Sequence, residues 1–370
     1  MKGIPELVQL AEAELGPVAE EAAAAYAQAT EAMTDQVNRA MEARDDLGML
    51  TGGNPLEMVR DNHRNHAAFI ANVLRFEQWE MLVTTVAWVY RTYASHGFSD
   101  DYFPEVLRAW KRAVCEHLPQ ELAEEVVPVY DWMLRAHGDM LGVRDEVPDL
   151  PSPGGRWEPV RRRFAAALLG ADHRTCLSIA EEAVDGDRGI GDFYMRVLQP
   201  AMYEIGQLWE SGQISVAQEH LASSIVGRVM TSIYLGCDCS RPPLGTAVVS
   251  AAPEEYHEIG CWMVSDMLEM DGWRVRYLGA NTPAEELMDY LRDDPPDLLA
   301  LSVTMPFNID RAADLVRALR ADPDLASIRI LLGGAAIGSV DGLWRRLGAD
   351  ATASDAAEAV RVCRKWANAG

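Results

Sequence analysis

Residues 245–260 read GTAVVSAAPEEYHEIG, and this stretch decides how the C-terminal part of the chain folds. It begins with a short apolar run, Thr246–Ser250, of the kind that forms a buried strand. It ends with E-x-H-x-x-G, in which Glu255 precedes His257 by two residues and Gly260 follows by three. A histidine that leaves a strand end beside a carboxylate can hold a ligand through one imidazole nitrogen while the carboxylate fixes the other.

Further apolar runs follow this stretch and alternate with helical patterns. Strands are expected at Thr246–Ala251, Trp273–Leu278, Leu298–Val303, Ile328–Leu332 and Ala349–Ala353, and helices at 258–270, 284–292, 309–320 and 339–347. Near-continuous apolar strands that alternate with helices predict a doubly wound parallel sheet covered on both faces. Ligands of such sheets bind at the carboxyl ends of the strands.

Two more motifs lie at these expected strand ends. Ser302 and Thr304 end the third strand, and Gly333-Gly334 ends the fourth. The sequence has 41 residues between Gly260 and Ser302, and 28 between Thr304 and Gly333. Small residues leave room beside a sheet, and hydroxyls can bind a nucleotide tail. The residues alone also suit a nucleotide-binding or response-regulator-like domain in which His257 caps a helix.

Together the motifs resemble the D-x-H-x-x-G, S-x-L, G-G signature of the cobalamin-binding domain shared by methionine synthase, the cobalamin mutases and cobalamin light sensors. Glu255 replaces the usual Asp, and Thr304 replaces the usual Leu. The resemblance implies that His257 is the lower axial ligand of cobalt and that the nucleotide tail passes down the Ser302/Gly333 cleft. The cofactor-binding residues that it implies on this side are Glu255, His257, Gly260, Ser302, Thr304, Gly333 and Gly334.

A four-helix bundle is expected before the sheet. Helical segments at 157–169, 175–184, 190–211 and 215–235 are joined by short turns, which favours antiparallel packing. Pro200 falls inside the third segment and is expected to kink it.

The bundle also contains W-x9-E-H, formed by Trp209, Glu219 and His220, with Val216 on the same helical face as the last two. In light-sensing cobalamin proteins this element covers the upper face of the cofactor and contacts the 5′-deoxyadenosyl group. The resemblance therefore implies that these four residues enclose that group. Glu210 stands where the light-sensing repressors often have a histidine, which leaves the cobalt ligand after illumination open. A bundle-anchoring tryptophan and a surface Glu-His pair are the alternative.

The first 141 residues show helical spacing throughout and no strand pattern. Three prolines and Gly154-Gly155 mark residues 142–156 as a linker. We therefore expect an all-helical globin-like sensor domain at 1–141, a bundle at 157–240 and a Rossmann-like cobalamin-binding domain at 241–370. The fold class is multidomain α and α/β.

The helical domain is similar to globin-like sensor domains, and more narrowly to the photocobilins, bacterial photoreceptors that pair cobalamin with biliverdin. This resemblance implies biliverdin as a second chromophore. Its implied bilin-binding residues are Arg91, Tyr93, His96, Tyr102 and Arg108. A heme on His63, His66, His96 or His137 is an alternative.

Composition excludes several classes of function. The net charge of −24 opposes binding to nucleic acid or to anionic lipid, so we expect neither as a partner. The sequence shows no signal peptide, no apolar run of about 20 residues and no C-x-x-C pair. A cytoplasmic location is expected.

The resemblance implies a light-sensing adenosylcobalamin photoreceptor that is not itself an enzyme. Light is expected to break the Co–C bond and change domain packing or homo-oligomeric state, which a downstream signalling protein can read. The main alternative is a corrinoid carrier, the corrinoid subunit of a methyltransferase, which must expose its cobalt and has no use for a tryptophan over it. A sensor of heme or bilin alone is a third possibility, disfavoured by the His257 loop.

Overall fold

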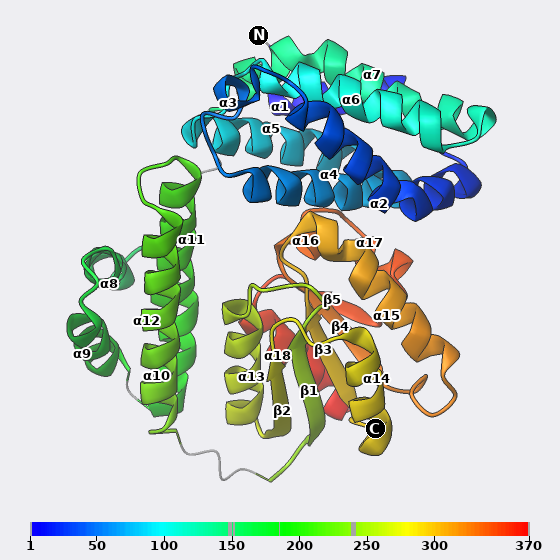
Figure 1. The fold of residues 1–370 in the computed structure, drawn as a ribbon. Helices are drawn as coiled ribbons and strands as arrows, with labels where there is room; N and C mark the ends of the chain where they lie inside the picture. The colour runs from blue at the N-terminus through cyan, green and yellow to red at the C-terminus, as the bar shows by residue number, and fades with distance from the viewer. Residues whose placement is uncertain (1, 147–149, 151, 185, 238–241, 369–370) are drawn as a thin grey trace. The chain divides into compact units, whose positions relative to one another are not determined.

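The computed structural model describes residues 2–146, 150, 152–184, 186–237 and 242–368, with only the backbone described at 187 and 188. The chain divides into two compact units (Figure 1). The first is Met1–Pro148 with Glu210–Gly212, and the second is Asp149–Trp209 with Gln213–Gly370. The finer borders expected from the sequence, at residues 141, 156 and 240, stay a prediction.

Helices alone form the first unit within the described residues, as the sequence predicts. They are α1 (Ile4–Glu14), α2 (Glu20–Glu42), α3 (Leu47–Leu50), α4 (Leu56–Phe76), α5 (Trp79–Ser95), α6 (Tyr102–His117) and α7 (Gln120–Val143). Apolar residues at helical spacing form their buried faces; Ile70, Val73 and Leu74 of α4 are at most 1% exposed. Helix α7 passes the expected start of the linker at 142, and linker residues 147–149 and 151 lie outside the described chain.

The second unit begins with the expected bundle. Its helices are α8 (Trp157–Leu169), α9 (His173–Ala183), α10 (Gly186–Phe193), α11 (Gln199–Glu210) and α12 (Val216–Tyr234). A π-helical turn, η1 (Tyr194–Leu198), separates α10 from α11, so the expected single helix at 190–211 is interrupted. Pro200 is the second residue after this turn and has no N–H to donate, which favours a local change of hydrogen-bond pattern at this point.

The sheet has five parallel strands in the order β2-β1-β3-β4-β5. They are β1 (Gly245–Ala251), β2 (Trp273–Gly279), β3 (Leu298–Ser302), β4 (Arg329–Gly333) and β5 (Ala351–Ala353). Helices α13 (Ile259–Asp271) and α18 (Ala356–Ala367) pack on one face, and α14 (Ala284–Asp293) and α15 (Ile309–Ala321) cover the other (Figure 1). This is the doubly wound sheet that the alternating pattern predicts.

One expected helix of the sheet domain is wrong. Residues 339–347 do not form a single helix; the structure has two short ones, α16 (Ala335–Gly338) and α17 (Leu343–Arg346). Gly342 between them has a φ of 70°, a left-handed conformation that ends a helix. The sequence analysis also missed α18, whose Asp355 accepts a hydrogen bond from Glu358 N as its N-cap.

The bundle packs on the sheet domain through α13. Their shared core joins bundle residues such as Phe193 to Met263 and Met270 of α13. Within this interface the Tyr194 hydroxyl donates a 2.6 Å hydrogen bond to the buried Asp266 carboxyl. Burial raises the pKa of Asp266 to about 7, although Tyr194 opposes the shift. The second unit is therefore one body in which the bundle can influence the sheet.

Candidate cofactor site

The three sequence motifs meet at one edge of the sheet. Ser302 lies opposite Ala251 of β1 on one side and opposite Gly333 of β4 on the other. From β1 the chain passes to β2 on one side and then returns to β3 on the other, so the loops after β1 and β3 flank the topological switch point. The predicted convergence of these loops at the carboxyl edge is therefore present in the fold.

Glu255 is the structural centre of this edge. Its side chain is 0% exposed. One carboxylate oxygen, Oε1, accepts from the backbone N–H of His257 (3.0 Å) and lies 2.5 Å from its Nδ1. The other, Oε2, accepts from Thr304 N (3.0 Å), Met305 N (2.8 Å) and Asn308 Nδ2 (3.1 Å). The carboxylate thus ties the loop after β1 to the loop after β3.

These donors decide the charge of the buried carboxyl group. Burial alone would raise the pKa of Glu255, but the hydrogen bond and charge of His257, with backbone N–H groups of Met305 and His257, lower it to about 2. Glu255 is therefore ionised at neutral pH. Its hydrogen bond is also the largest cause that raises the pKa of His257, against an opposing effect of burial.

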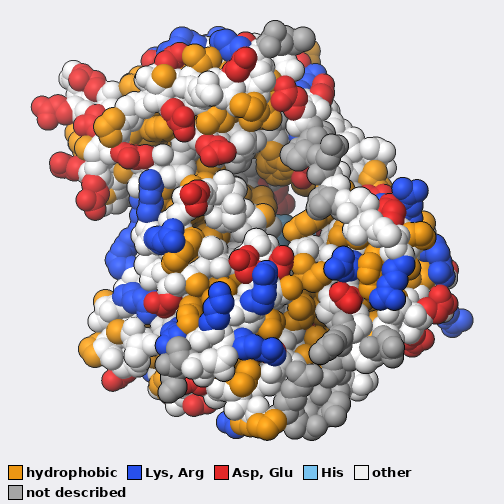
Figure 2. Space-filling model, turned by 180° about the vertical axis from the view of Figure 1, so that it is seen from behind, with side chains coloured by type: hydrophobic (Ala, Val, Ile, Leu, Met, Phe, Trp, Pro, Cys, Tyr) orange, Lys and Arg blue, Asp and Glu red, His pale blue; other side chains and the backbone are white. Residues whose placement is uncertain are grey.

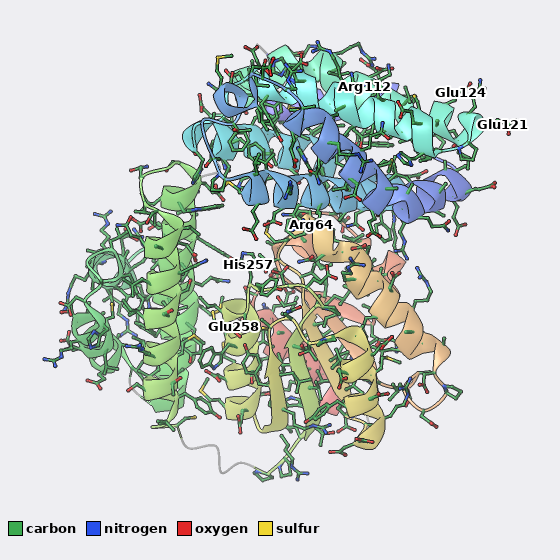
Figure 3. The ribbon with its side chains drawn as sticks, in the orientation of Figure 1. Arg64, Arg112, Glu121, Glu124, His257 and Glu258 are labelled. Atoms are coloured by element: carbon green, nitrogen blue, oxygen red, sulfur yellow. The ribbon has the colours of Figure 1, made fainter. Side chains whose placement is uncertain are left out.

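His257 presents its other nitrogen outward. The side chain is 57% exposed, and Nε2 has no hydrogen-bond partner among the described residues. Figure 3 shows His257 and Glu258 on the loop that leads from β1 into α13. An imidazole whose Nδ1 faces a buried carboxylate carries its lone pair on Nε2 when neutral, which is the arrangement found in metal-ligating histidines.

Sequence reasoning missed how the β3 loop takes part. Thr304 contacts Glu255 through its backbone N–H, and no hydroxyl contact to the carboxylate is involved. Asn308, 3% exposed, also donates to Glu254 O (3.3 Å) and was not singled out at all. An asparagine four residues beyond the motif carries no distinctive signal, because such residues are common in loops.

The glycines of the motifs differ in what they provide. A Cβ at Gly260 would meet nothing within 4 Å, so this position borders open space. Gly334 has a φ of 94°, and a Cβ there would lie 2.3 Å from Val303 O, so only glycine fits. Gly333 is close-packed, with Ala353 O 3.3 Å from the Cβ position. Room beside the sheet is therefore found at Gly260, while Gly334 permits close approach of the β3 and β4 loops.

The W-x9-E-H residues lie at the end of α11 and the start of α12. Ser215 and Gln218 form a capping box that fixes where α12 begins. Glu219 accepts from Ser223 Oγ (2.8 Å) and lies 2.6 Å from His220 Nδ1, and Val216 is 53% exposed. The Glu219 carboxylate is near enough to His257 to contribute to its raised pKa. The expected upper and lower residues thus belong to one region of the second unit.

The candidate bilin residues have partners within the first unit. Arg91 pairs with Glu210 (2.9 Å) and Arg108 pairs with Glu105 (2.5 Å), so both cations already face carboxylates. Tyr93 packs against Phe98, with ring centroids 4.7 Å apart. Tyr102 Oη lies 2.9 Å from Nε2 of His63, and His96 Nδ1 lies 2.8 Å from Thr92 O. A bilin would have to displace these contacts.

The histidines considered for heme are also engaged. His63 is 2% exposed and has Asn38 Oδ1 2.6 Å from Nδ1 and Tyr102 Oη 2.9 Å from Nε2. His66 Nε2 lies 3.4 Å from Tyr130 Oη, and His137 Nδ1 lies 2.9 Å from Tyr90 Oη. Both ring nitrogens of His63 thus have protein partners, whereas His66 and His137 are each contacted at one nitrogen.

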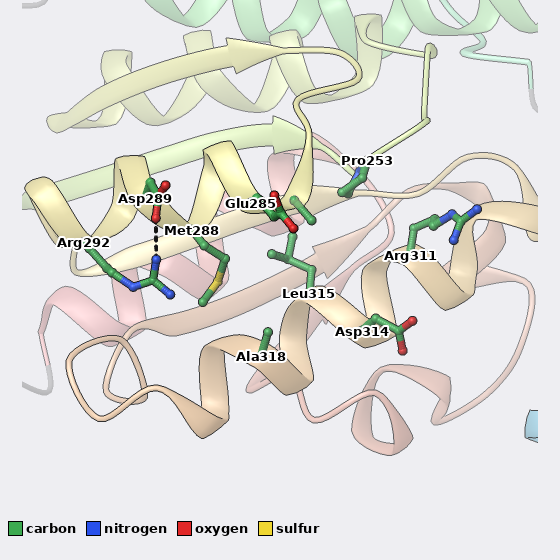
Figure 4. Close-up of a pocket in the computed structure, with 10 residues that line it drawn as sticks. Pro253, Glu285, Met288, Asp289, Arg292, Arg311, Asp314, Leu315 and Ala318 are labelled. Atoms are coloured by element: carbon green, nitrogen blue, oxygen red, sulfur yellow. Dashed lines mark hydrogen bonds and ion pairs between the residues drawn. The ribbon is translucent and has the colours of Figure 1, made fainter.

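A hollow of about 590 Å³ lies between α14 and α15 (Figure 4). Apolar side chains such as Met288 and Leu315 line it beneath charged ones. Its two arginines are paired, Arg292 with Asp289 and Arg311 with Glu254. None of the predicted cofactor residues lines it. This hollow is therefore distinct from the rim that carries His257.

Two models of the B12 binding domain match the second unit. One matches residues 160–234, which span the bundle, and the other matches residues 245–361, which span the sheet domain. The second unit carries B12 binding domains. Cobalamin, or a related corrinoid, is therefore the cofactor indicated for this unit. The resemblance to photocobilins covers the whole chain, and the part of it that implies biliverdin, residues 1–141, lies outside both matches.

Individual relatives of two kinds are similar to parts of this chain. The HTH-type transcriptional repressor CarH of Myxococcus xanthus is 34% identical over 152 residues, which are 41% of this chain and 50% of CarH. Monomethylamine corrinoid protein 2 of Methanosarcina acetivorans is 27% identical over 206 residues, 54% of this chain and 94% of that protein. The solved monomethylamine corrinoid protein of Methanosarcina barkeri is 23% identical, with a TM-score of 0.49, and the match covers 56% of this chain and 99% of that one. This chain spans half the length of CarH.

The rim has the chemistry that a corrinoid needs. His257 offers a nitrogen donor backed by a buried carboxylate, and Gly260 borders open space beside it. The protein residues present thus fit the cofactor that the family matches indicate.

The molecular surface gives no single basic region on the face that Figure 2 presents, where Lys and Arg side chains are mixed with Asp, Glu and apolar ones. The expectation that the chain binds no nucleic acid stays a prediction, since CarH is by name a transcriptional repressor. None of the described helices has the length and apolar character to cross a membrane.

Proposed function

We propose that this chain is a light-sensing adenosylcobalamin-binding protein without catalytic activity of its own, in which His257 is the lower axial ligand of cobalt. The observation that carries the proposal is the His257–Glu255 pair, in which Nδ1 is held by a buried carboxylate and Nε2 is left to bind. Because a ligating imidazole must be neutral, the proton that Glu255 stabilises on His257 has to leave when the metal binds.

The bundle supports the adenosyl form of the cofactor. Trp209 stands at the end of α11 and Glu219 in the first turn of α12, where Val216 and His220 accompany it. The Glu219 carboxylate, oriented by Ser223, can accept hydrogen bonds from a ribose or adenine. Similarity to CarH over 152 residues supports the same assignment. Adenosylcobalamin would supply a cobalt–carbon bond that light can break.

The packing of α12 on α13 offers a route from the site to the surface. A Cβ at Gly227 would lie 3.2 Å from the Trp262 ring, so the two helices approach closely there. Illumination would remove the proposed contacts between the adenosyl group and the first turn of α12. Loss of these contacts would change the relative stability of alternative packings of α12. Couplings of this kind are typically about 1–3 kcal/mol, or roughly 5- to 150-fold in an association constant. We therefore expect light-dependent homo-oligomerisation or binding of a signalling partner.

The decisive experiment compares absorption spectra of the full chain loaded with adenosylcobalamin or methylcobalamin, before and after green light, together with the affinity for each. We expect tighter binding of the adenosyl form and a lasting spectral change after illumination. Trp209→Ala should reduce the preference, and Glu219→Ala should weaken binding of the adenosyl form by about 1–3 kcal/mol because a hydrogen-bond acceptor is lost. Equal affinity of the unchanged protein for both cobalamins contradicts the proposal.

A corrinoid carrier for methyl transfer is the second candidate. The observation that favours it is the match to a monomethylamine corrinoid protein over 94% of that protein's length. A carrier has to bind methylcobalamin at least as well as the adenosyl form, and Trp209→Ala should then leave the preference unchanged. The same binding measurement therefore separates the two functions.

Biliverdin binding by the first unit stays a prediction. It requires Arg91 and Arg108 to exchange Glu210 and Glu105 for propionates. Biliverdin added to the full chain should give a red-absorbing band that disappears on denaturation, and Arg91→Ala with Arg108→Ala should weaken it. Absence of a band would mean that the first unit is not a bilin site and would favour a heme or a purely structural role.

A further inference from the structure

The loop that carries His257 is held from a second side by Asn281, in the turn between β2 and α14. Asn281 N donates to Glu255 O (3.0 Å), and its side-chain Oδ1 accepts from Glu254 N (3.1 Å). Its Nδ2 donates to the hydroxyl of Tyr256 (3.2 Å). Three atoms of Asn281 thus bind the three residues that immediately precede His257.

Both partners in this contact have left-handed backbone conformations. Glu254 has a φ of 64° and Asn281 a φ of 53°, and the only other such non-glycine residues in the described chain are Glu77 and Ala171. Non-glycine residues adopt this region at a cost, and asparagine does so more readily than most. Two such residues bonded to each other define the path of the loop, because neither can relax without breaking the hydrogen bond from Glu254 N to Asn281.

Tyr256 is the second part of this arrangement. Its side chain is 71% exposed, although its hydroxyl is bound by Asn281. It directly precedes His257, whose own direction is fixed only through Glu255. A bond to the Tyr256 hydroxyl therefore restrains the chain on the side of His257 that Glu255 does not hold.

We propose that Asn281 is a positioning residue for His257: by holding Glu254, Glu255 and Tyr256, it sets the direction in which the imidazole presents Nε2. The inference rests on the proposed role of His257 as the cobalt ligand. It assigns a function to the β2–α14 turn, which none of the cobalamin motifs includes. Asn281 acts through the loop and touches no part of the cofactor.

The test uses three substitutions in the full chain. Asn281→Gly keeps the left-handed backbone and removes both side-chain hydrogen bonds. Asn281→Asp keeps the acceptor for Glu254 N, and its second carboxylate oxygen can accept from the Tyr256 hydroxyl in place of the lost donor, whereas Tyr256→Phe removes that bond. Ala171→Gly is the matched control, because Ala171 is exposed, has a φ of 54° and lies in the turn after α8, far along the chain from this loop.

Two properties are measured for each variant. The first is binding of cob(II)alamin to protein with 15N-labelled histidine, with the splitting from the labelled nitrogen in the EPR spectrum as the signature of imidazole ligation. The second is amide hydrogen exchange of residues 254–257 in the cofactor-free protein. Asn281→Gly should weaken binding about 3- to 10-fold, lower the nitrogen-split fraction and speed exchange, as expected for loss of two hydrogen bonds. Tyr256→Phe should weaken binding about 2- to 3-fold, and Asn281→Asp should have a smaller effect, because its carboxylate can keep a bond to each partner.

The inference fails if Asn281→Gly behaves like Ala171→Gly in affinity, nitrogen splitting and exchange. It fails equally if Tyr256→Phe matches the unchanged protein, which covers the case in which the glycine variant does not fold. His257→Ala separates this result from the main proposal. If His257→Ala keeps the nitrogen splitting, His257 is not the ligand and the proposed function fails. If His257→Ala loses the splitting but the Asn281 substitutions have no effect, only the positioning role is overturned.

Discussion

His63 in the first unit and His257 in the second show two opposite ways of treating an imidazole. His63 is 2% exposed, and both of its nitrogens face protein oxygens, on Asn38 and Tyr102. The side chain of His257 is 57% exposed, with one nitrogen on a buried carboxylate and the other without a partner among the described residues. The first arrangement uses the ring to hold helices together, and the second leaves it available to a ligand.

The pKa shifts follow the same difference. Burial lowers the pKa of His63 to about 4, so the ring is neutral at physiological pH. The hydrogen bond from Glu255 raises the pKa of His257. What distinguishes them is the partner: neutral oxygens cannot compensate burial of a cation, whereas an ionised carboxylate stabilises it and fixes which nitrogen stays free. A functional histidine is thus recognised by its carboxylate and its open nitrogen together.

Loss of the ligand itself should have the largest effect. His257→Ala should abolish imidazole ligation and shift the bound corrinoid to a base-off absorption spectrum, because it removes the imidazole that the loop after β1 presents at this rim. His63→Ala should leave the corrinoid spectrum unchanged and affect only stability. An unchanged spectrum for His257→Ala overturns the assignment.

Acid should destabilise the first unit through His63. Its folded pKa of about 4 lies below the ordinary value of 6.5, so the unfolded chain takes up the proton first and stability is lost as pH falls from 6.5 toward 4. At about 1.4 kcal/mol per unit this amounts to roughly 3 kcal/mol. The contribution of His257 has the opposite sign, because a raised pKa favours folding at low pH and is lost as pH rises through it.

Thermal unfolding of the full chain and of His63→Gln between pH 4 and 7 measures this effect. Glutamine keeps a hydrogen-bonding side chain and cannot take up a proton in this range. The difference in midpoint between the two proteins should therefore change with pH below 6.5 and be constant above it. A difference that is independent of pH would mean that the pKa of His63 is the same in the folded and the unfolded chain.

Substitution of Glu255, the carboxylate that holds His257, should have the next largest effect. Glu255→Gln keeps the shape of the side chain, removes its charge and turns one acceptor into a donor that must face an N–H group of His257 or of the β3 loop. Carboxylate partners of metal-ligating histidines are typically worth 10- to 100-fold in affinity, and we expect a loss of cobalamin affinity in that range. Glu254→Gln is the control, since its ion pair with Arg311 is exposed and worth little. Equal cobalamin affinities of the two variants would show that the Glu255 carboxylate does not contribute to cobalamin binding.

The sequence predicts those features of the fold and of the site that depend on periodicity and local motifs. Alternation of strands and helices predicts the parallel sheet, and strand ends at Ser302 and Gly333 predict where the motifs meet. It does not predict that Thr304 contributes a backbone N–H, because this depends on the path of a loop. Nor does it predict the contacts of Asn281 and Asn308, which join residues 27 and 53 positions apart. The single helix expected at 339–347 failed for a local reason, the left-handed Gly342.

The smallest effect that we predict concerns Asn308, and it compares two asparagines that support two histidines. Asn38 contacts His63 directly, whereas Asn308 is one of three donors on the far oxygen of Glu255. Asn308→Ala should weaken cobalamin binding by only about 0.5–1.5 kcal/mol, because Thr304 N and Met305 N continue to hold the carboxylate. Asn38→Ala should cost a similar amount of stability and leave cobalamin affinity unchanged. Titration with cobalamin and thermal unfolding of both variants test this pair, and an effect of Asn38→Ala on cobalamin affinity would show that the two histidines are coupled through the chain.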